Sequence, residues 1–276
     1  MIFEFAGIRI NIELFHSVEN KKPCLIFLHG FTGSSNDWKH IVPNINQDFS
    51  SAGIDLIGHG KSSSPVDKEF YSADIIVNQI YNITTSIIKR KIIPVGYSMG
   101  GRAALSFAVK HPELIEGLIL ESSTPGIEDE KLREERIARD EEIASYIESH
   151  TMEDFAEYWM DMEIFNTQRR FSEEKRKQLR QTRINNDPTG LTNSLRGFGT
   201  GTMPHLFPYL KNINCKTLLI TGELDSKFTT INKDAVKQFK NAEHKMIKNA
   251  GHNTHAEEPH RFTQVVNDFL KNFRSL

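Results

Sequence analysis

The chain has 276 residues, of which 34 are basic and 36 acidic, and its formal net charge at pH 7 is -2. This balance excludes the basic field that nucleic-acid binding needs and the polybasic patch that holds a protein on a membrane surface. The first fourteen residues lack the apolar run of a secretory signal, and no later run is long enough to span a bilayer. We expect a monomer or small homo-oligomer without nucleic-acid or membrane partners.

The two cysteines support a reduced protein. Cys24 and Cys215 each begin an apolar strand-like run, far apart in the sequence and without the spacing of metal ligands. We therefore expect a cytoplasmic location and no metal.

Short apolar runs mark the expected strands in chain order. The first fourteen residues alternate apolar and polar side chains, which indicates a strand. Further apolar runs occupy 24–28, 92–96, 117–120 and 217–220, each followed by a turn of Gly, His or Ser and then a helical pattern. Buried runs that alternate with amphipathic helices are typical of a mostly parallel sheet with helices on both faces. The pattern predicts an α/β fold.

The composition changes near residue 126. From Glu128 to Arg183 the chain is dense in Glu, Lys and Arg, its apolar residues recur at helical spacing, and no strand-like run occurs. We predict a helical cap over residues 126–205, inserted into a core made of residues 1–125 and 206–276. A final helix is expected over 257–273.

The segment KIIPVGYSMGGRAALSFAVK reads as a strand, a tight turn and a helix. Gly96 and Gly100 flank Ser98 in the turn, and a side chain at either glycine would collide with neighbouring elements. Such a turn raises the serine hydroxyl above the sheet, at the positive end of the next helix. The pattern predicts a reactive Ser98, the alternative being an ordinary tight turn. Pro94 is a departure, because a central strand loses a ladder hydrogen bond there.

A serine hydroxyl becomes reactive when a histidine accepts its proton and a carboxylate orients that histidine. The chain order serine, acid, histidine favours His252, in the loop after the apolar stretch 245–247. His255 is the alternative, with a helix-capping or surface role as its other reading. Asp225, just past TLLITG, is the expected acid, and its rival Glu223 is expected to be solvated.

Two loops could stabilise a developing negative charge. The glycines of the loop HGFTG, after the first buried strand, allow the N–H of Phe31 to point at an oxyanion. The N–H of Met99, next to the reactive serine, would be the second donor. A plain glycine-rich strand-to-helix loop is the alternative for HGFTG.

Five motifs resemble the α/β-hydrolase superfamily along essentially the whole chain: HGFTGS, DLIGHGKS, GYSMGGR, GELD and AGH. A narrower resemblance is to the 2-succinyl-6-hydroxy-2,4-cyclohexadiene-1-carboxylate synthase family of menaquinone (vitamin K2) biosynthesis. It rests on GYSMGGR and on ESSTPGI, RINND, LRGFGTG and GELDSKF, which begin at residues 121, 183, 195 and 222. This resemblance implies a lyase that uses the triad to remove a proton and expel pyruvate from an enolpyruvyl-carrying cyclohexene carboxylate, without cofactor or metal.

The resemblance also implies residues that bind a small polycarboxylate substrate: Tyr97, Arg102, Arg136, Trp159 and Arg183. Arg102 has an independent argument, because a cation in the first turn of a helix is disfavoured by roughly 0.3–1 kcal/mol. A carboxylate ligand would supply the compensating charge, and guanidinium groups bind carboxylates bidentately. For the arginines the alternative is an ion pair on a helix surface, and for Trp159 a place in the core.

Two other functions remain open. In the first, the same fold acts as an esterase, thioesterase or carbon–carbon bond hydrolase in which Ser98 becomes acylated. In the second, the chain is a non-catalytic receptor that keeps the pocket and binds a small ligand.

Overall fold

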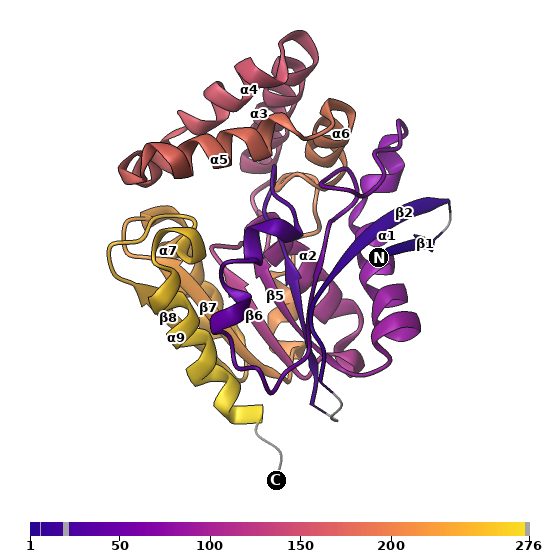
Figure 1. The fold of residues 1–276 in the computed structure, drawn as a ribbon, viewed down its shortest axis with the longest axis vertical. Helices are drawn as coiled ribbons and strands as arrows, with labels where there is room; N and C mark the ends of the chain where they lie inside the picture. The colour runs from indigo at the N-terminus through magenta and orange to yellow at the C-terminus, as the bar shows by residue number, and fades with distance from the viewer. Residues whose placement is uncertain (6, 19–21, 274–276) are drawn as a thin grey trace.

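The computed structural model describes residues 1–5, 7–18 and 22–273. Residue 6, within the predicted first strand, and residues 274–276, at the end of the predicted core segment, lie outside the described residues. Figure 1 shows a central twisted sheet flanked by helices, with a group of helices above one end of it.

The described strands form one sheet in the order β1-β2-β4-β3-β5-β6-β7-β8. β2 is antiparallel to both of its neighbours, and all other pairs are parallel, so the predicted mostly parallel sheet is confirmed. The strands are β1 (Ile2–Phe5), β2 (Ile8–His16), β3 (Cys24–Leu28), β4 (Ser51–Ile54), β5 (Ile92–Tyr97), β6 (Gly117–Glu121), β7 (Lys216–Gly222) and β8 (Ala242–Ile247).

The described part of the first fourteen residues forms two antiparallel strands, β1 and β2, where we expected a single strand. Phe5 pairs with Ile8, and Gly7 has a φ of +77° in the left-handed region, which glycine adopts without steric cost. β2 alternates apolar and polar side chains, whereas β1 has four residues and no buried side chain, so it gives no separate strand signal.

The helices are α1 (Ala73–Asn82), α2 (Met99–Lys110), α3 (Glu130–Ser149), α4 (Met152–Met160), α5 (Glu173–Ile184), α6 (Pro188–Phe198), α7 (Ser226–Ala235), α8 (Thr254–Glu257) and α9 (Pro259–Leu270). The 3₁₀ segment η6 (Glu163–Arg170) joins α4 to α5. The predicted final helix is divided: Pro259 begins α9, and a 3₁₀ turn, η9 (Lys271–Phe273), follows it.

Alternate residues of the buried strands face opposite layers of helices. In β3, Ile26 and Leu28 belong to the apolar cluster that includes α1 and α2, whereas Leu25 and Phe27 belong to the cluster that includes α9. Every residue of β3 and β5 is buried, as expected for central parallel strands covered on both faces. At Pro94 the β5–β6 ladder is interrupted between the Ile92 bridge and the Val95 pair.

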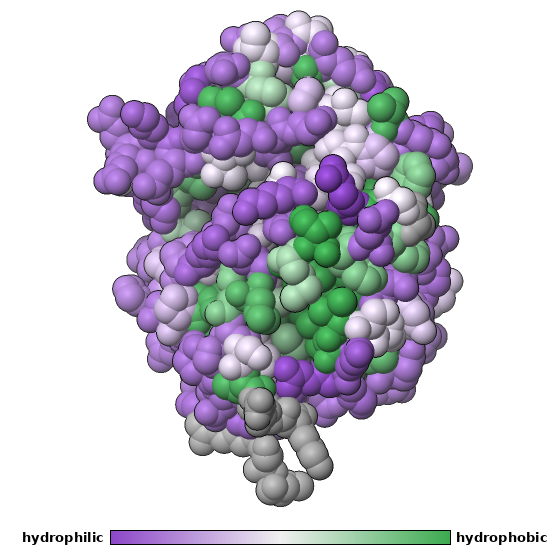
Figure 2. Space-filling model, turned by 45° about the vertical axis from the view of Figure 1, so that its right-hand side comes forward, coloured by the Kyte–Doolittle hydropathy of each residue, from purple (hydrophilic) through white to green (hydrophobic). Residues whose placement is uncertain are grey.

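Helices α3 to α6 lie between β6 and β7 in the chain and above the sheet in Figure 1. α3, α4 and α6 share a small apolar cluster of their own: Ile143, Ala144, Ile147, Phe155, Leu191 and Leu195. The upper part of the surface in Figure 2 is largely hydrophilic, in keeping with the charged composition of this segment. Below, we call α3 to α6 and η6 the cap helices.

Both cysteines are unpaired. Burial raises the pKa of Cys24 and of Cys215 to about 11, so both are thiols at neutral pH. No helix within the described ranges is long and apolar enough to cross a membrane.

Candidate active site

Ser98 lies in a strained turn between β5 and α2. Its φ of +49° and ψ of -107° are unusual for a residue with a side chain. A Cβ at Gly96 would meet the carbonyl oxygen of Gly100, and one at Gly100 would meet that of Leu28. The predicted need for both glycines is therefore confirmed. The turn is also held by the N–H of Ser98, which donates to the carbonyl oxygen of Glu121 at 2.8 Å.

The structure brings Ser98, His252 and Asp225 together at the carboxyl ends of β5, β8 and β7. The Oγ of Ser98 lies 3.1 Å from Nε2 of His252, and Nδ1 of His252 lies 2.7 Å from Oδ2 of Asp225. His252 and Asp225 are buried, whereas Ser98 is half-buried. A proton on Nδ1 is held by the carboxylate, which leaves the lone pair of Nε2 facing the hydroxyl. The arrangement can remove a proton from Ser98.

Glu223, the rival acid, does not reach this histidine. Its side chain is exposed, as predicted, and accepts the N–H of Asn249 at 3.0 Å. Asp225 instead turns inward and also caps α7, because its Oδ1 accepts the N–H of Phe228 at 3.3 Å.

His255 is buried, so the surface role considered for it is wrong. Its Nδ1 lies 2.7 Å from Oε2 of Glu121, and its ring stacks on Trp38 with the centroids 4.2 Å apart. Glu121 ends a fully buried strand, where a carboxylate requires hydrogen-bond donors. His255 contacts this carboxylate through its ring and its N–H, and the serine hydroxyl lies within hydrogen-bond distance of His252 instead.

The two predicted oxyanion donors line the cavity that contains Ser98. Phe31 follows β3 in the HGFTG loop, and Met99 is the first residue of α2. Neither N–H has an acceptor among the residues that the structure describes. Both are available to an oxygen of a ligand.

Two arginines line the same cavity, which has a volume of about 120 Å³. Arg102 is buried, donates to the carbonyl oxygen of Phe198 and lies over its ring, 4.9 Å from the centroid. Burial and the nearby Arg136 lower the pKa of Arg102 to about 9, and it remains a cation at neutral pH. Arg136 donates to Asp140 at 2.9 Å. This is the i,i+4 ion pair that the sequence analysis gave as the alternative to substrate binding. Arg136 also lines the cavity, although its side chain is partly exposed to solvent.

Aromatic side chains form the walls beside the triad. Trp159 lies against Phe31 with the ring centroids 5.1 Å apart, and its buried Nε1 has no hydrogen-bond partner among the described residues. The buried ring of Tyr97 lies 5.4 Å from that of His252. Burial and the carboxylate of Glu121 raise the pKa of Tyr97, which keeps its hydroxyl protonated. Both residues lie where a ligand in the cavity would touch them.

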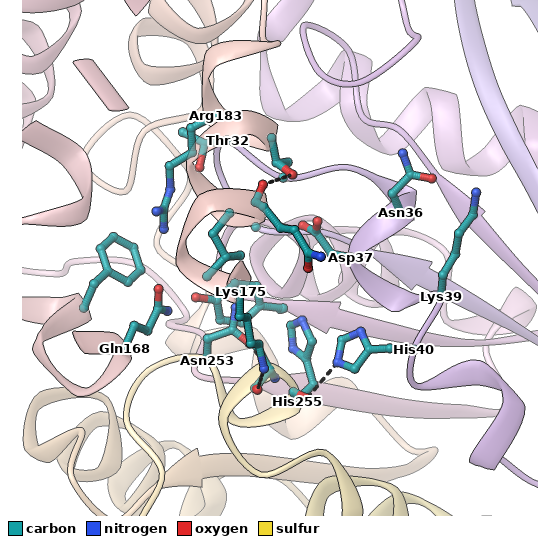
Figure 3. A pocket seen from close by; sticks show the side chains of 18 of the residues that line it. Thr32, Asn36, Asp37, Lys39, His40, Gln168, Lys175, Arg183, Asn253 and His255 are labelled. Atoms are coloured by element: carbon teal, nitrogen blue, oxygen red, sulfur yellow. Dashed lines mark hydrogen bonds between the residues drawn. The ribbon is translucent and has the colours of Figure 1, made fainter. Parts of the chain in front are cut away.

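Arg183 lies in an adjoining cavity of about 590 Å³, shown in Figure 3. The two cavities share Phe31, Tyr97 and Phe165 as walls. Arg183 is 6% exposed and lies over the Phe165 ring, 5.2 Å from its centroid, and its Nη1 has no partner among the described residues. Burial lowers the pKa of Arg183 to about 10. The three arginines thus do not meet at one point. Arg102 and Arg136 line the cavity of Ser98, and Arg183 lines the adjoining cavity.

Several residues of the site were not predicted from the sequence. Glu121 and Glu257 are buried carboxylates that bind the loop of His252, Asp140 is a buried carboxylate beside Arg136, and Phe228 packs on His252 with centroids 4.4 Å apart. Only Glu121 had a usable signal, a charged residue at the end of an apolar run. Within the described ranges, no group of three or more His, Cys, Asp or Glu side chains could hold a metal ion.

A serine turn after β5, an acid after β7 and a histidine after β8 define the α/β-hydrolase class of proteins. The family model described as "alpha/beta hydrolase fold" matches residues 23–259. Among solved structures of low identity, an enol-lactonase from Burkholderia xenovorans LB400 has a TM-score of 0.84 at 18% identity, covering 98% of this chain and 100% of that one. At that identity the likeness shows the fold alone.

Relatives of higher sequence identity show which family within this fold the chain belongs to. The structure titled "Structure of MenH from S. aureus" has a TM-score of 0.91 and 32% identity, covering 96% of this chain and 99% of that one. A 2-succinyl-6-hydroxy-2,4-cyclohexadiene-1-carboxylate synthase of Serratia proteamaculans (strain 568) is 30% identical over 92% of this chain and 95% of its own. A Bacillus subtilis (strain 168) protein, 38% identical over 91% of both chains, carries that name provisionally. The chain belongs to the 2-succinyl-6-hydroxy-2,4-cyclohexadiene-1-carboxylate synthase family.

Proposed function

We propose that this chain is a carbon–oxygen lyase that makes 2-succinyl-6-hydroxy-2,4-cyclohexadiene-1-carboxylate. Its substrate would be 2-succinyl-5-enolpyruvyl-6-hydroxy-3-cyclohexene-1-carboxylate, from which it eliminates pyruvate. Ser98, His252 and Asp225 are the catalytic residues of this proposal. The names and coverage of its relatives support the reaction, and the geometry of the three side chains supports the roles.

The observation that carries the proposal is the buried Arg102 beside Ser98. Its guanidinium has no carboxylate within ion-pair distance among the described residues, although burying a cation is costly unless an anion compensates it. Arg136 and Lys227 line the same cavity. Among the described residues, Asp140 is the carboxylate that pairs with one of these cations, Arg136. Such a cavity favours an anionic ligand over a neutral ester. A carboxylate of the substrate would provide the missing charge.

The proposed reaction needs a base and a place for an oxyanion. Nε2 of His252 takes the Ser98 proton, and the Ser98 oxygen removes a proton from the substrate ring. The electron pair moves onto the carbonyl oxygen conjugated with that position, which the N–H groups of Phe31 and Met99 stabilise. The pair then returns to the ring as a new double bond, the existing ring double bond shifts by one position, and the carbon–oxygen bond to the enolpyruvyl group breaks. The leaving pyruvate enolate takes the proton held on Nε2 of His252 and becomes pyruvate, which returns the imidazole to its neutral form.

The adjoining cavity has a role in this proposal. A volume of about 120 Å³ is small for the whole substrate, and the cavity with Arg183 begins on the other side of the shared walls. Arg183 would bind a second carboxylate there, with Tyr97 and Trp159 enclosing the ring. The segment 126–205 is the proposed cap, because its residues Arg136, Trp159 and Arg183 close the site from above.

The experiment is a pyruvate assay on the enolpyruvyl substrate, with oxidation of NADH by added lactate dehydrogenase as the readout. We expect release by the wild type and a decrease of kcat by at least about 10³-fold in Ser98→Ala. Wild-type protein that releases no pyruvate, while it is folded by circular dichroism, would remove the assignment.

The same triad geometry could serve an esterase, thioesterase or carbon–carbon hydrolase. Turnover of the natural substrate distinguishes the two mechanisms. A lyase that uses Ser98 as a base gives no stoichiometric burst with the natural substrate, and mass spectrometry finds no covalent adduct during turnover. An acyl-enzyme that accumulates on Ser98 with the natural substrate would favour the hydrolase.

A further inference from the structure

The loop that carries His252 is held on one side by Glu257. Its carboxylate accepts the N–H of Gly251 at 2.8 Å and that of Asn253 at 3.3 Å, the residues immediately before and after the histidine. The Glu257 side chain has no solvent exposure. Hydrogen bonds to a buried carboxylate are among the stronger ones, so this residue fixes the backbone from which the imidazole projects.

Glu121 holds the other end of the same loop from the sheet. Its carboxylate accepts the hydroxyl of Thr254 at 2.7 Å and the N–H of His255 at 2.9 Å, in addition to its contact with the His255 ring. Glu121 lies in β6, inside the rigid core. The two ends of the loop are therefore anchored differently: one to the sheet and one through Glu257.

Glu257 in turn contacts the cap. Arg170, in η6, donates from Nη2 to Oε2 of Glu257 at 2.9 Å and to the carbonyl oxygen of Asn249. Thr167 of the same segment packs directly on Gly251, because a Cβ there would meet its Oγ1. Lys175 donates to the carbonyl oxygen of Ala256. Cap side chains thus reach the loop both before and after His252.

We propose that Arg170 and Glu257 are positioning residues for His252, through which the cap sets the distance between the imidazole and Ser98. The inference rests on the proposed function insofar as His252 is the base. Neither residue touches the reacting atoms: Arg170 acts on Glu257, and Glu257 acts on the two backbone N–H groups. A displacement of about 1 Å in a catalytic group can lower a rate by 10²-fold, so a small shift of the loop has a large effect.

The test compares Arg170→Ala with Arg169→Ala. Both arginines lie in η6, but Arg169 pairs with Asp161 within the cap, with Nη2 and Oδ1 3.4 Å apart and both side chains exposed. The loss of charge is the same, and only Arg170 touches the histidine loop. Arg170→Lys keeps the ion pair, and Glu257→Gln keeps one acceptor oxygen while it removes the charge.

The first readout is the rate at which a small neutral aryl phosphonate labels Ser98, because this reaction needs His252 but not the natural substrate. We expect Arg170→Ala to label about 10-fold more slowly than the wild type, Arg170→Lys to recover most of the rate and Arg169→Ala to match the wild type. The melting temperature of Arg170→Ala should lie below that of Arg169→Ala, because the substitution leaves the buried Glu257 carboxylate without its cation, so labelling is measured at a temperature where every variant is folded. In the pyruvate assay, kcat should fall and KM should stay unchanged.

Labelling of Arg170→Ala within twofold of Arg169→Ala would overturn the proposal. So would equal losses in Arg170→Ala and Arg170→Lys, because the ion pair would then be irrelevant. If Glu257→Gln does not fold, the Arg170 variants still decide the question. A wild type that reacts with the phosphonate but releases no pyruvate defeats the proposed function and leaves the positioning test intact.

Discussion

The carboxylate of Glu121 lies 2.7 Å from Nδ1 of His255, and neither side chain is more than 1% exposed. The pair joins the end of β6 to the loop that carries His252, and the same glutamate accepts the N–H of Ser98 through its backbone carbonyl. One residue therefore contacts both the serine turn and the histidine loop. The positions of both parts of the candidate active site therefore depend on this buried glutamate.

Replacement of Glu121 by alanine should destabilise the protein strongly. It leaves the His255 ring, the His255 N–H and the Thr254 hydroxyl without their buried acceptor. We expect the free energy of unfolding to fall by about 3 kcal/mol, as measured by urea denaturation. Glu116→Ala is the control, because Glu116 forms an exposed pair with Lys91 and should cost about 0.5 kcal/mol or less. Similar losses in the two variants would contradict the prediction.

Replacement of Asp225 by asparagine should abolish most of the activity while the fold survives. The amide can no longer stabilise the imidazolium or hold the proton on Nδ1 of His252, and kcat should fall by about 10⁴-fold in the pyruvate assay. Glu223→Gln, in the same loop but exposed, should retain activity within twofold. If Glu223→Gln were the more damaged variant, the acid would have been assigned to the wrong residue.

Arg183→Met should separate stability from substrate binding. The substitution removes a buried guanidinium whose Nη1 has no partner, so the free energy of unfolding should rise by about 1 kcal/mol. KM for the polycarboxylate substrate should increase by at least about 10-fold, which is the loss of one charge-assisted hydrogen bond. Arg180→Met on the same helix, whose arginine pairs with Glu157 at the surface, should change neither quantity. An unchanged KM in Arg183→Met would exclude the residue from the binding site.

Stability should decrease in acid partly because of His59. Burial lowers the pKa of His59 from 6.5 to about 3, so the folded protein keeps this ring neutral while the unfolded chain protonates it below pH 6.5. The unfolded state then binds the additional proton, and the contribution of His59 to stability, complete above pH 6.5, is lost as the pH falls from 6.5 towards 3. The slope is about 1.4 kcal/mol per pH unit.

Urea denaturation at pH 7, 6 and 5 measures this slope in the wild type and in His59→Asn. The variant should be less stable at pH 7 but lose less stability between pH 6 and pH 5. Parallel pH profiles for the two proteins would show that the histidine does not titrate on unfolding.

The strand pattern was readable where side chains were large and apolar. β3, β5, β6 and β7 coincide closely with predicted runs, because strands buried on both faces have to be apolar throughout. β4 was missed, since its sequence SAGI has small side chains and little hydrophobicity. Its place between β2 and β3 depends on packing: a Cβ at Gly53 would meet the ring of Phe15. That constraint comes from a different part of the chain.

The sequence by itself determined the serine turn and the order in which serine, acid and histidine follow their strands, because glycine requirements and buried apolar runs are local properties. Only the tertiary structure decided that His255 turns away to Glu121, that Arg183 enters a second cavity, and that Glu257 brackets His252. These outcomes depend on contacts between segments that hydrophobic periodicity cannot relate, since it records which face of an element is buried but not which side chain it meets there.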